Sequence, residues 1–171
     1  QFLGTVALSP LEVNQMYLTL ASEGLYQPLT TVRAVLGDDN QILYQKDAKA
    51  ERRLDARVSY LTLFTMTKVA SQGTARSLAA RFPGSVLAGK TGTTDNLRDS
   101  WFSGLDNDEL VSVWVGRDDN KPAGLTGANG ALQLFGDYLE RRGVNLLQLA
   151  APKGIVWANC SRGGKPVDSG C

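Results

Sequence analysis

Residues 87–94 (LAGKTGTT) constrain the fold of this chain most, because one lysine belongs to two motifs with opposite structural requirements. Starting at Gly84, residues 84–91 fit G-x-x-x-x-G-K-[ST], a phosphate-binding loop that lies between a buried strand and the start of a helix. Starting at Lys90, residues 90–93 form K-T-G-T within an apolar, β-branched run that is typical of a strand. The neighbouring residues have to decide between a loop and a strand.

These neighbours favour the strand. Upstream, residues 77–83 (SLAARFP) predict a short helix that a proline ends, whereas a phosphate-binding loop follows a strand. Downstream, glycine, two threonines and the pair Asp95-Asn96 are poor residues for a helix interior. We therefore predict a strand over residues 85–94 and keep a P-loop NTPase as the alternative.

Composition limits the chemistry further. The 171 residues are 43% hydrophobic, which suits about one domain with a core of its own. With a net charge of +1 and no basic run, the chain has no sign of nucleic-acid or membrane-surface binding. It has no histidine, which excludes Ser-His-Asp and Cys-His catalysis and zinc sites with histidine ligands. A general base must then be lysine, a carboxylate or water, and we expect no metal or other cofactor.

Caps, turns and periodicity predict a mixed α+β fold, an antiparallel sheet flanked by helices. A capping box at residues 9–12 opens a helix to about Glu23, and Asp55 caps a second helix that stops at Gly73. Further strands are expected at 31–36, 41–45, 100–104 and 110–115, with a charged connector at 46–53, a short helix at 75–80 and a final helix at 129–142. Apolar stripes are expected in the second helix at Val58, Leu61, Phe64, Thr65 and Val69, and in the final helix at Leu132, Phe135 and Leu139.

The lysine strand has a chemistry of its own. Alternation places Lys90 and Gly92 on one face and Thr91 and Thr93 on the other. All four serve one site only if that site follows an open strand edge, where an extended peptide can add as another strand. There Gly92 allows close approach, the threonine hydroxyls can hold a carboxylate, and a nearby N–H can serve in an oxyanion hole. The competing interpretation is an ordinary strand with an exposed lysine and β-branched threonines.

Several longer stretches resemble class A penicillin-binding proteins, and among them the 1b type of Gram-negative bacteria. They are 89–94 (GKTGTT), 99–102 (DSWF) with Gly104, 114–118 (WVGRD), 8–13 (LSPLEV) with 21–24 (ASEG), and 127–131 (GANGA). These bifunctional enzymes polymerise glycan strands and cross-link peptidoglycan. The resemblance implies the transpeptidase fold shared with serine β-lactamases, incomplete in this chain, with two further strands supplied from upstream sequence.

The resemblance also implies roles for the motif residues. Lys90 would organise proton transfer, Thr91 and Thr93 would bind the carboxylate of a stem peptide or β-lactam, and Gly92 and Thr94 would complete the substrate-binding strand. The backbone N–H of Thr93 would form half of the oxyanion hole, which makes Lys90 and Thr93 the expected catalytic residues.

The expected nucleophile is absent from the sequence. No serine has a lysine three residues later, and S-x-N is also missing. The resemblance places both motifs before Gln1, with a glycosyltransferase region and a membrane anchor further upstream. We thus expect residues 1–150 to be the C-terminal half of a transpeptidase domain, inactive alone, and 151–171 to be a weakly structured tail. A catalytically inactive peptidoglycan- or partner-binding module remains as a second alternative.

Two cysteines lie in the tail. The spacing of Cys160 and Cys171 fits no metal motif, and they would form a disulfide in an oxidising compartment or remain thiols in the cytosol. The resemblance favours the disulfide, because it implies a location at the periplasmic face of the inner membrane. It further implies stem peptides, β-lactams, the missing half of the domain and an outer-membrane lipoprotein activator as partners, with no membrane contact from this segment.

Overall fold

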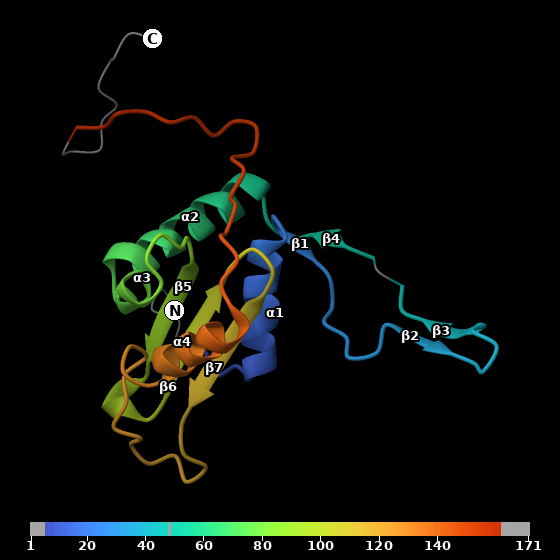
Figure 1. Cartoon of the computed structure of the whole chain (residues 1–171), viewed down its shortest axis with the longest axis horizontal. Coiled ribbons are helices and arrows are strands. Elements are labelled where there is room, and N and C mark those ends of the chain that lie inside the picture. Colours follow the sequence, from blue (N-terminus) through green and yellow to red (C-terminus); the bar gives the residue numbers. More distant parts are fainter. Residues whose placement is uncertain (1–5, 48, 162–171) are drawn as a thin grey trace.

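The computed structural model describes residues 6–47 and 49–161, and a three-stranded antiparallel sheet lies at its centre (Figure 1). Its strands run in the order β5 (Ala88–Thr93), β6 (Ser100–Leu105) and β7 (Leu110–Val115). The larger helices are α1 (Pro10–Ala21), α2 (Ala56–Gln72) and α4 (Ala131–Arg142), and the shorter ones are α3 (Ser77–Arg81) and the 3-10 turn η1 (Asp95–Leu97). The predicted mixed α+β fold with an antiparallel sheet flanked by helices is confirmed.

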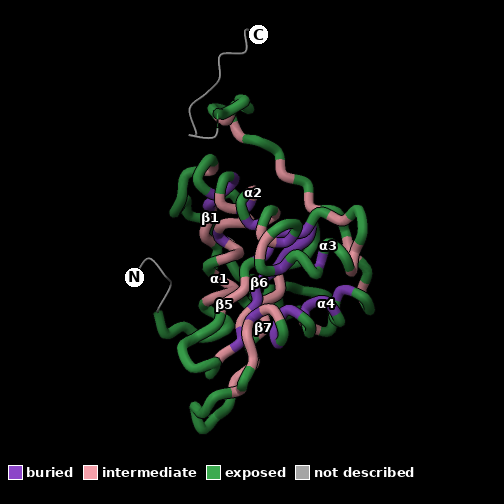
Figure 2. Tube along the Cα trace, turned by 90° about the vertical axis from the view of Figure 1, so that its left-hand side faces the viewer, coloured by how far each residue is buried: buried purple, intermediate pink, exposed green. Residues whose placement is uncertain are grey.

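One face of the sheet packs against α4 through an aromatic pair. The rings of Phe102 on β6 and Phe135 on α4 lie 4.9 Å apart, and both residues are buried. Gly89 and Gly104 face each other across β5 and β6 and make room for these rings. A Cβ on Gly89 would lie 2.4 Å from Phe102, and one on Gly104 would lie 2.7 Å from Phe135. Leu132 and the other expected core residues of α4 are buried, as Figure 2 shows for the helix.

The opposite face of the sheet packs against α1 and the middle of α2. Leu63 and Met66 of α2 join Ala88 and Leu105 of the sheet in one apolar cluster. A buried polar ladder lies beside it, because the hydroxyls of Ser103 and Ser112 hydrogen-bond at 2.8 Å and Ser112 also donates to Asn14 of α1. The sheet is therefore a layer between helices.

The start of α1 forms as the sequence predicts, and the helix ends at Ala21, two residues before the expected Glu23. Ser9 accepts a hydrogen bond from the backbone N–H of Glu12, and the Glu12 carboxylate accepts one from the N–H of Ser9 at 2.8 Å. The chain then turns at Gly24, whose φ is +86° and where a Cβ would lie 2.2 Å from the carbonyl oxygen of Leu54. Glycine is required there because of both the left-handed backbone and the close contact.

Two expectations about the first half of the chain are wrong in detail. The predicted connector at 46–53 contains a short strand, β4 (Glu51–Arg52), which pairs with an unpredicted strand, β1 (Leu25–Tyr26). The predicted apolar stripe of α2 includes Val58 and Leu61, which are 52% and 50% exposed. The buried residues of that helix are Ser59, Tyr60, Leu63, Met66 and Ala70. Both sets have helical spacing, so spacing alone could not select the buried one.

The predicted hairpin at 31–45 forms β2 (Ala34–Leu36) and β3 (Ile42–Gln45) and projects away from the central sheet (Figure 1). Its large apolar residues stay exposed, and Ile42 and Leu43 are both 62% exposed. The hairpin adds nothing to the core of the described residues.

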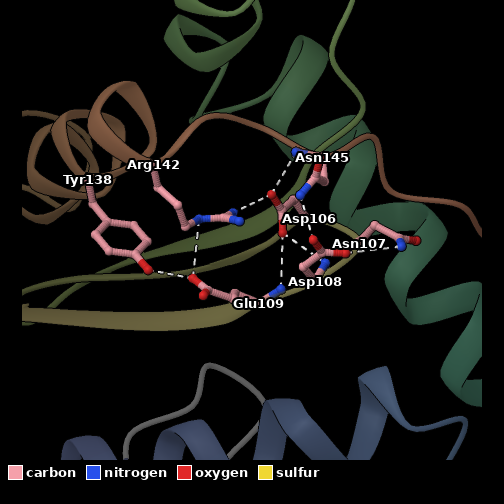
Figure 3. Close-up of polar contacts among 7 residues, drawn as sticks. All are labelled: Asp106, Asn107, Asp108, Glu109, Tyr138, Arg142 and Asn145. Atoms are coloured by element: carbon pink, nitrogen blue, oxygen red, sulfur yellow. Dashed lines mark hydrogen bonds and ion pairs between the residues drawn. The ribbon is translucent and has the colours of Figure 1, made fainter.

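The β6–β7 turn is fastened to the end of α4 by the carboxylate of Asp106 (Figure 3). Its oxygens accept hydrogen bonds from the N–H groups of Asp108 and Glu109 at 3.0 Å and of Asn145 at 2.9 Å, and they pair with Arg142. Burial alone would raise the pKa of this carboxyl, but the backbone donors and Arg142 outweigh burial, so the pKa of Asp106 lies below its ordinary value.

Replacing Asp106 by asparagine should lower the free energy of unfolding by about 2 kcal/mol at neutral pH, because the half-buried Arg142 loses one of its two carboxylate partners and the backbone donors lose a charged acceptor. A depressed pKa stabilises the folded state above the unfolded-state pKa of about 3.9, and this stabilisation is lost as pH falls through the lower folded-state value. Urea unfolding should therefore show the difference between wild type and Asp106→Asn to be constant near neutrality and to shrink in acid. The exposed carboxylate of Asp118 provides the control, and an equal loss in Asp118→Asn would contradict the assignment.

Candidate active site

Lys90 lies in the middle of strand β5, which excludes the phosphate-loop geometry. The strand contains Lys90, Thr91, Gly92 and Thr93, and no helix begins at any of these residues. The next helical element is only the short 3-10 turn η1, in which Asn96 has a φ of +60°. The predicted strand is confirmed, and the P-loop alternative is not favoured.

Strand β5 is an edge strand within the described residues. It pairs with β6 only, in a register that opposes Lys90 to Ser103, Thr91 to Phe102 and Thr93 to Ser100. Because side chains alternate, Lys90 and Gly92 lie on the face that carries α1, and Thr91 and Thr93 on the face that carries α4. The predicted division of the motif between two faces is thus observed.

The same register decides which backbone groups of β5 have no partner on β6. One residue beyond the strand, Thr94 lies opposite Asp99, and the N–H of Thr94 donates to the carbonyl of Asp99 at 3.2 Å. Bonded and non-bonded pairs alternate along an antiparallel ladder. Gly92 and Lys90 therefore pair with β6, while the N–H and C=O groups of Thr91 and Thr93 point to the open edge.

Two residues of β5 lie on the α1 face of this edge, Lys90 and Gly92. Lys90 is exposed, and its ammonium donates to the carbonyl oxygen of Thr91 at 2.6 Å. Gly92 lies against Trp101, and a Cβ at position 92 would come within 2.9 Å of the Trp101 Cβ. The charge of Lys90 is thereby held next to an edge carbonyl.

The side chain of Thr93 is hydrogen-bonded to the loop that precedes α4. Its Oγ1 accepts a hydrogen bond from the N–H of Gly127 at 2.9 Å. A Cβ on Gly127 would lie 2.7 Å from the Gly92 carbonyl oxygen, so only glycine allows the loop to come this close. Since Thr93 accepts from this N–H, its own hydroxyl hydrogen remains available to a ligand.

Thr91 has a partner that sequence reasoning missed. The hydroxyls of Thr74 and Thr91 hydrogen-bond at 2.7 Å. Thr74 directly follows the C-cap Gly73 of α2, in a turn anchored by the buried Ala75. Thr74 belongs to no motif and lies far from Lys90 in the sequence, so no pattern could have identified it.

Thr94 closes the strand through Asp99. Its hydroxyl donates to the Asp99 carboxylate at 2.8 Å, and the N–H of Asp99 donates back to the Thr94 oxygen at 2.8 Å. The other carboxylate oxygen of Asp99 accepts from the indole of Trp114 at 2.9 Å. Thr94 therefore shapes the turn at the end of the strand.

Other kinds of site find little support in residues 6–47 and 49–161. No group of three or more His, Cys, Asp or Glu side chains there could hold a metal ion. None of the helices in this part of the chain combines the length and apolarity needed to cross a bilayer. Cys160 is exposed, and Cys171 lies outside the described residues, so their pairing stays a prediction.

Comparison with known proteins shows the family to which the chain belongs. Residues 3–128 match the penicillin binding protein transpeptidase domain, and the chain belongs to that family. It is 43% identical over 168 residues to penicillin-binding protein 1B of Escherichia coli and 42% identical over 169 residues to penicillin-binding protein 1B of Vibrio cholerae. These matches cover 98% and 97% of the chain, but only 20% and 22% of the relatives.

Solved structures support the fold. Penicillin-binding protein 1A from Haemophilus influenzae superposes with a TM-score of 0.84 at 19% sequence identity. The match covers 95% of this chain and 31% of the other. The chain therefore has the fold of part of a penicillin-binding protein and spans about a fifth of the length of the curated relatives named above.

Ser100 offers a test of how the loop behind Thr93 is held. Its buried hydroxyl donates to the Thr126 carbonyl at 2.7 Å and accepts from the N–H of Ala131 at 2.8 Å. Ser100→Ala should lower the free energy of unfolding by about 2 kcal/mol, because the buried N–H of Ala131 and the part-buried carbonyl of Thr126 both lose a partner. Ser71→Ala should cost far less, since the exposed Ser71 hydroxyl bonds only within α2. Equal losses in urea unfolding would contradict the role of Ser100.

Proposed function

We propose that this chain supplies the substrate-binding strand of a serine D,D-transpeptidase that cross-links peptidoglycan stem peptides and that β-lactams inhibit. The single observation that carries the proposal is the open edge of β5, with the backbone groups of Thr91 and Thr93 directed outward beside the ammonium of Lys90. Membership of the transpeptidase family supports it. The glycosyltransferase activity expected of a bifunctional enzyme would lie in sequence outside this chain.

In the proposed reaction, a stem peptide adds to the open edge of β5 as an extended strand. The Thr93 N–H donates to the carbonyl oxygen of the scissile D-Ala–D-Ala bond as negative charge develops there. The hydroxyls of Thr91 and Thr93 donate to the terminal carboxylate, and Gly92 and Thr94 shape the strand around it. Lys90 stabilises the developing charge and organises proton transfer near the serine.

The nucleophilic serine is proposed to come from sequence outside this chain. No serine of the chain is followed by lysine three residues later, and the chain spans about a fifth of its relatives. The serine oxygen would attack the carbonyl carbon of the penultimate D-Ala and release the terminal D-Ala. An amine of a neighbouring stem peptide would then take the acyl group and free the serine.

The proposed setting follows from the family. We place the complete enzyme at the periplasmic face of the inner membrane, anchored by sequence that this chain does not include. The missing half of the domain, carrying S-x-x-K, is its obligatory partner. An outer-membrane lipoprotein activator remains a prediction from the resemblance.

A fluorescent penicillin can test whether the nucleophilic serine lies outside this chain. The isolated chain should not become covalently labelled, whereas the longer polypeptide that also carries S-x-x-K should. In that polypeptide Lys90→Ala should slow acylation roughly a hundredfold, because one preorganised charge contact at such a site contributes about 3 kcal/mol. Lys121→Ala, at an exposed lysine outside β5, is the matched control. Labelling of the isolated chain, or an unchanged rate for Lys90→Ala, would overturn the proposal.

The tail provides an independent test of location. Cys160 and Cys171 should be joined in protein recovered from the periplasm, where thiols are oxidised. Intact-mass measurement without reductant should then show the loss of two hydrogens, and reduction should restore them. Two cysteines that react with an alkylating agent before reduction would contradict the prediction.

A further inference from the structure

Among the described residues, Thr74 is the one side chain from outside the lysine strand that hydrogen-bonds to the Thr91 hydroxyl. The two oxygens lie 2.7 Å apart, and either can be the donor. Thr74 is exposed, and Thr91 is half-buried on the edge strand. This contact connects the end of α2 to the residue that we propose to hold the substrate carboxylate.

The chemistry of a carboxylate decides the direction of this bond. At neutral pH a carboxylate has no hydrogen to give, so Thr91 can bind it only by donating its single hydroxyl hydrogen. If that hydrogen went to Thr74, Thr91 would offer the ligand nothing but lone pairs. Productive binding therefore requires Thr74 to donate and Thr91 to accept.

Thr93 shows the same arrangement without ambiguity. Its Oγ1 accepts from the backbone N–H of Gly127, which can only donate. Each of the two threonines on this face of β5 thus has a hydrogen-bond partner within the protein, Gly127 for Thr93 and Thr74 for Thr91. For Thr93 the hydroxyl hydrogen is thereby left for a ligand at the open edge, and for Thr91 it is left there when Thr74 is the donor.

The turn that carries Thr74 is held by two backbone hydrogen bonds and by one buried residue. The N–H of Ala75 donates to the Val69 carbonyl at 3.2 Å, and that of Arg76 donates to the Gly73 carbonyl at 3.2 Å. Ala75 is fully buried in the core cluster that also contains Phe102 and Phe135. The Thr74 backbone is therefore fixed to the same core that supports the lysine strand.

We propose that Thr74 is a positioning residue that orients the Thr91 hydroxyl as a donor to the carboxylate of the substrate or β-lactam. This inference rests on the proposed transpeptidase function and adds one residue to it. It predicts that Thr74 matters only to ligands that carry the carboxylate, and only while Thr91 has a hydroxyl.

The test compares acylation of the longer polypeptide, with S-x-x-K, by benzylpenicillin and by its methyl ester. Thr74→Val should slow acylation by the acid about fivefold, because one neutral hydrogen bond contributes about 1 kcal/mol. The rate with the ester should stay close to that of the wild type. Thr74→Ser, which keeps the hydroxyl, should behave as the wild type does. Thr65→Val makes the same exchange on α2, where the hydroxyl bonds to the helix's own Leu61 carbonyl, and should change neither rate.

A double-mutant cycle separates positioning from general damage. In a Thr91→Val background, Thr74→Val should cause no further loss with the acid, because the two residues act through one bond. Equal losses with acid and ester, additive losses in the cycle, or a Thr74→Ser rate as low as that of Thr74→Val would overturn the inference while leaving the proposed function intact. No acylation of the wild-type polypeptide by benzylpenicillin would overturn both.

Discussion

The antiparallel pairing of β5 with β6 is the constraint on which the rest of the site depends. The pairing is close enough for the Phe102 ring to lie over Gly89 and Gly104, where any side chain would collide with it. Phe102 then packs on Phe135, and each buried phenylalanine contributes up to about 3 kcal/mol through burial. A shift of one residue would turn every side chain of β5 to the other face and break this contact.

This register also explains how four adjacent residues can serve one site. Lys90 and Gly92 approach the edge from the α1 side, Thr91 and Thr93 approach it from the α4 side, and the backbone groups of the threonines point along the sheet toward the edge itself. An interior strand could not do this, because its backbone groups would be bonded on both sides. The position of the strand at an edge is thus as important as its sequence.

Sequence reasoning worked where the signal was local. The residues next to Lys90 indicated a strand, and the stripe at Leu132 and Phe135 indicated the buried face of α4 correctly. It failed for α2, because Val58 begins one helical stripe and Ser59 begins another, and only tertiary contacts select between them. Strands of two residues, such as β1 and β4, have no periodicity to detect. The contact with Thr74 depends on how α2 ends beside β5, which no spacing within the sequence encodes.

The hydrogen bonds around the lysine strand suggest why these supporting residues come from distant parts of the chain. A hydroxyl that rotates freely must be ordered when a carboxylate arrives, and this ordering weakens binding. Gly127 hydrogen-bonds to the hydroxyl of Thr93 before a ligand is present, and we propose that Thr74 orders the hydroxyl of Thr91 in the same way. Each supporting group is attached to a different helix that packs on the same core around Phe102. The folding of this chain can therefore set the donor geometry of the strand in advance, and under the proposed function only the serine has to come from sequence outside it.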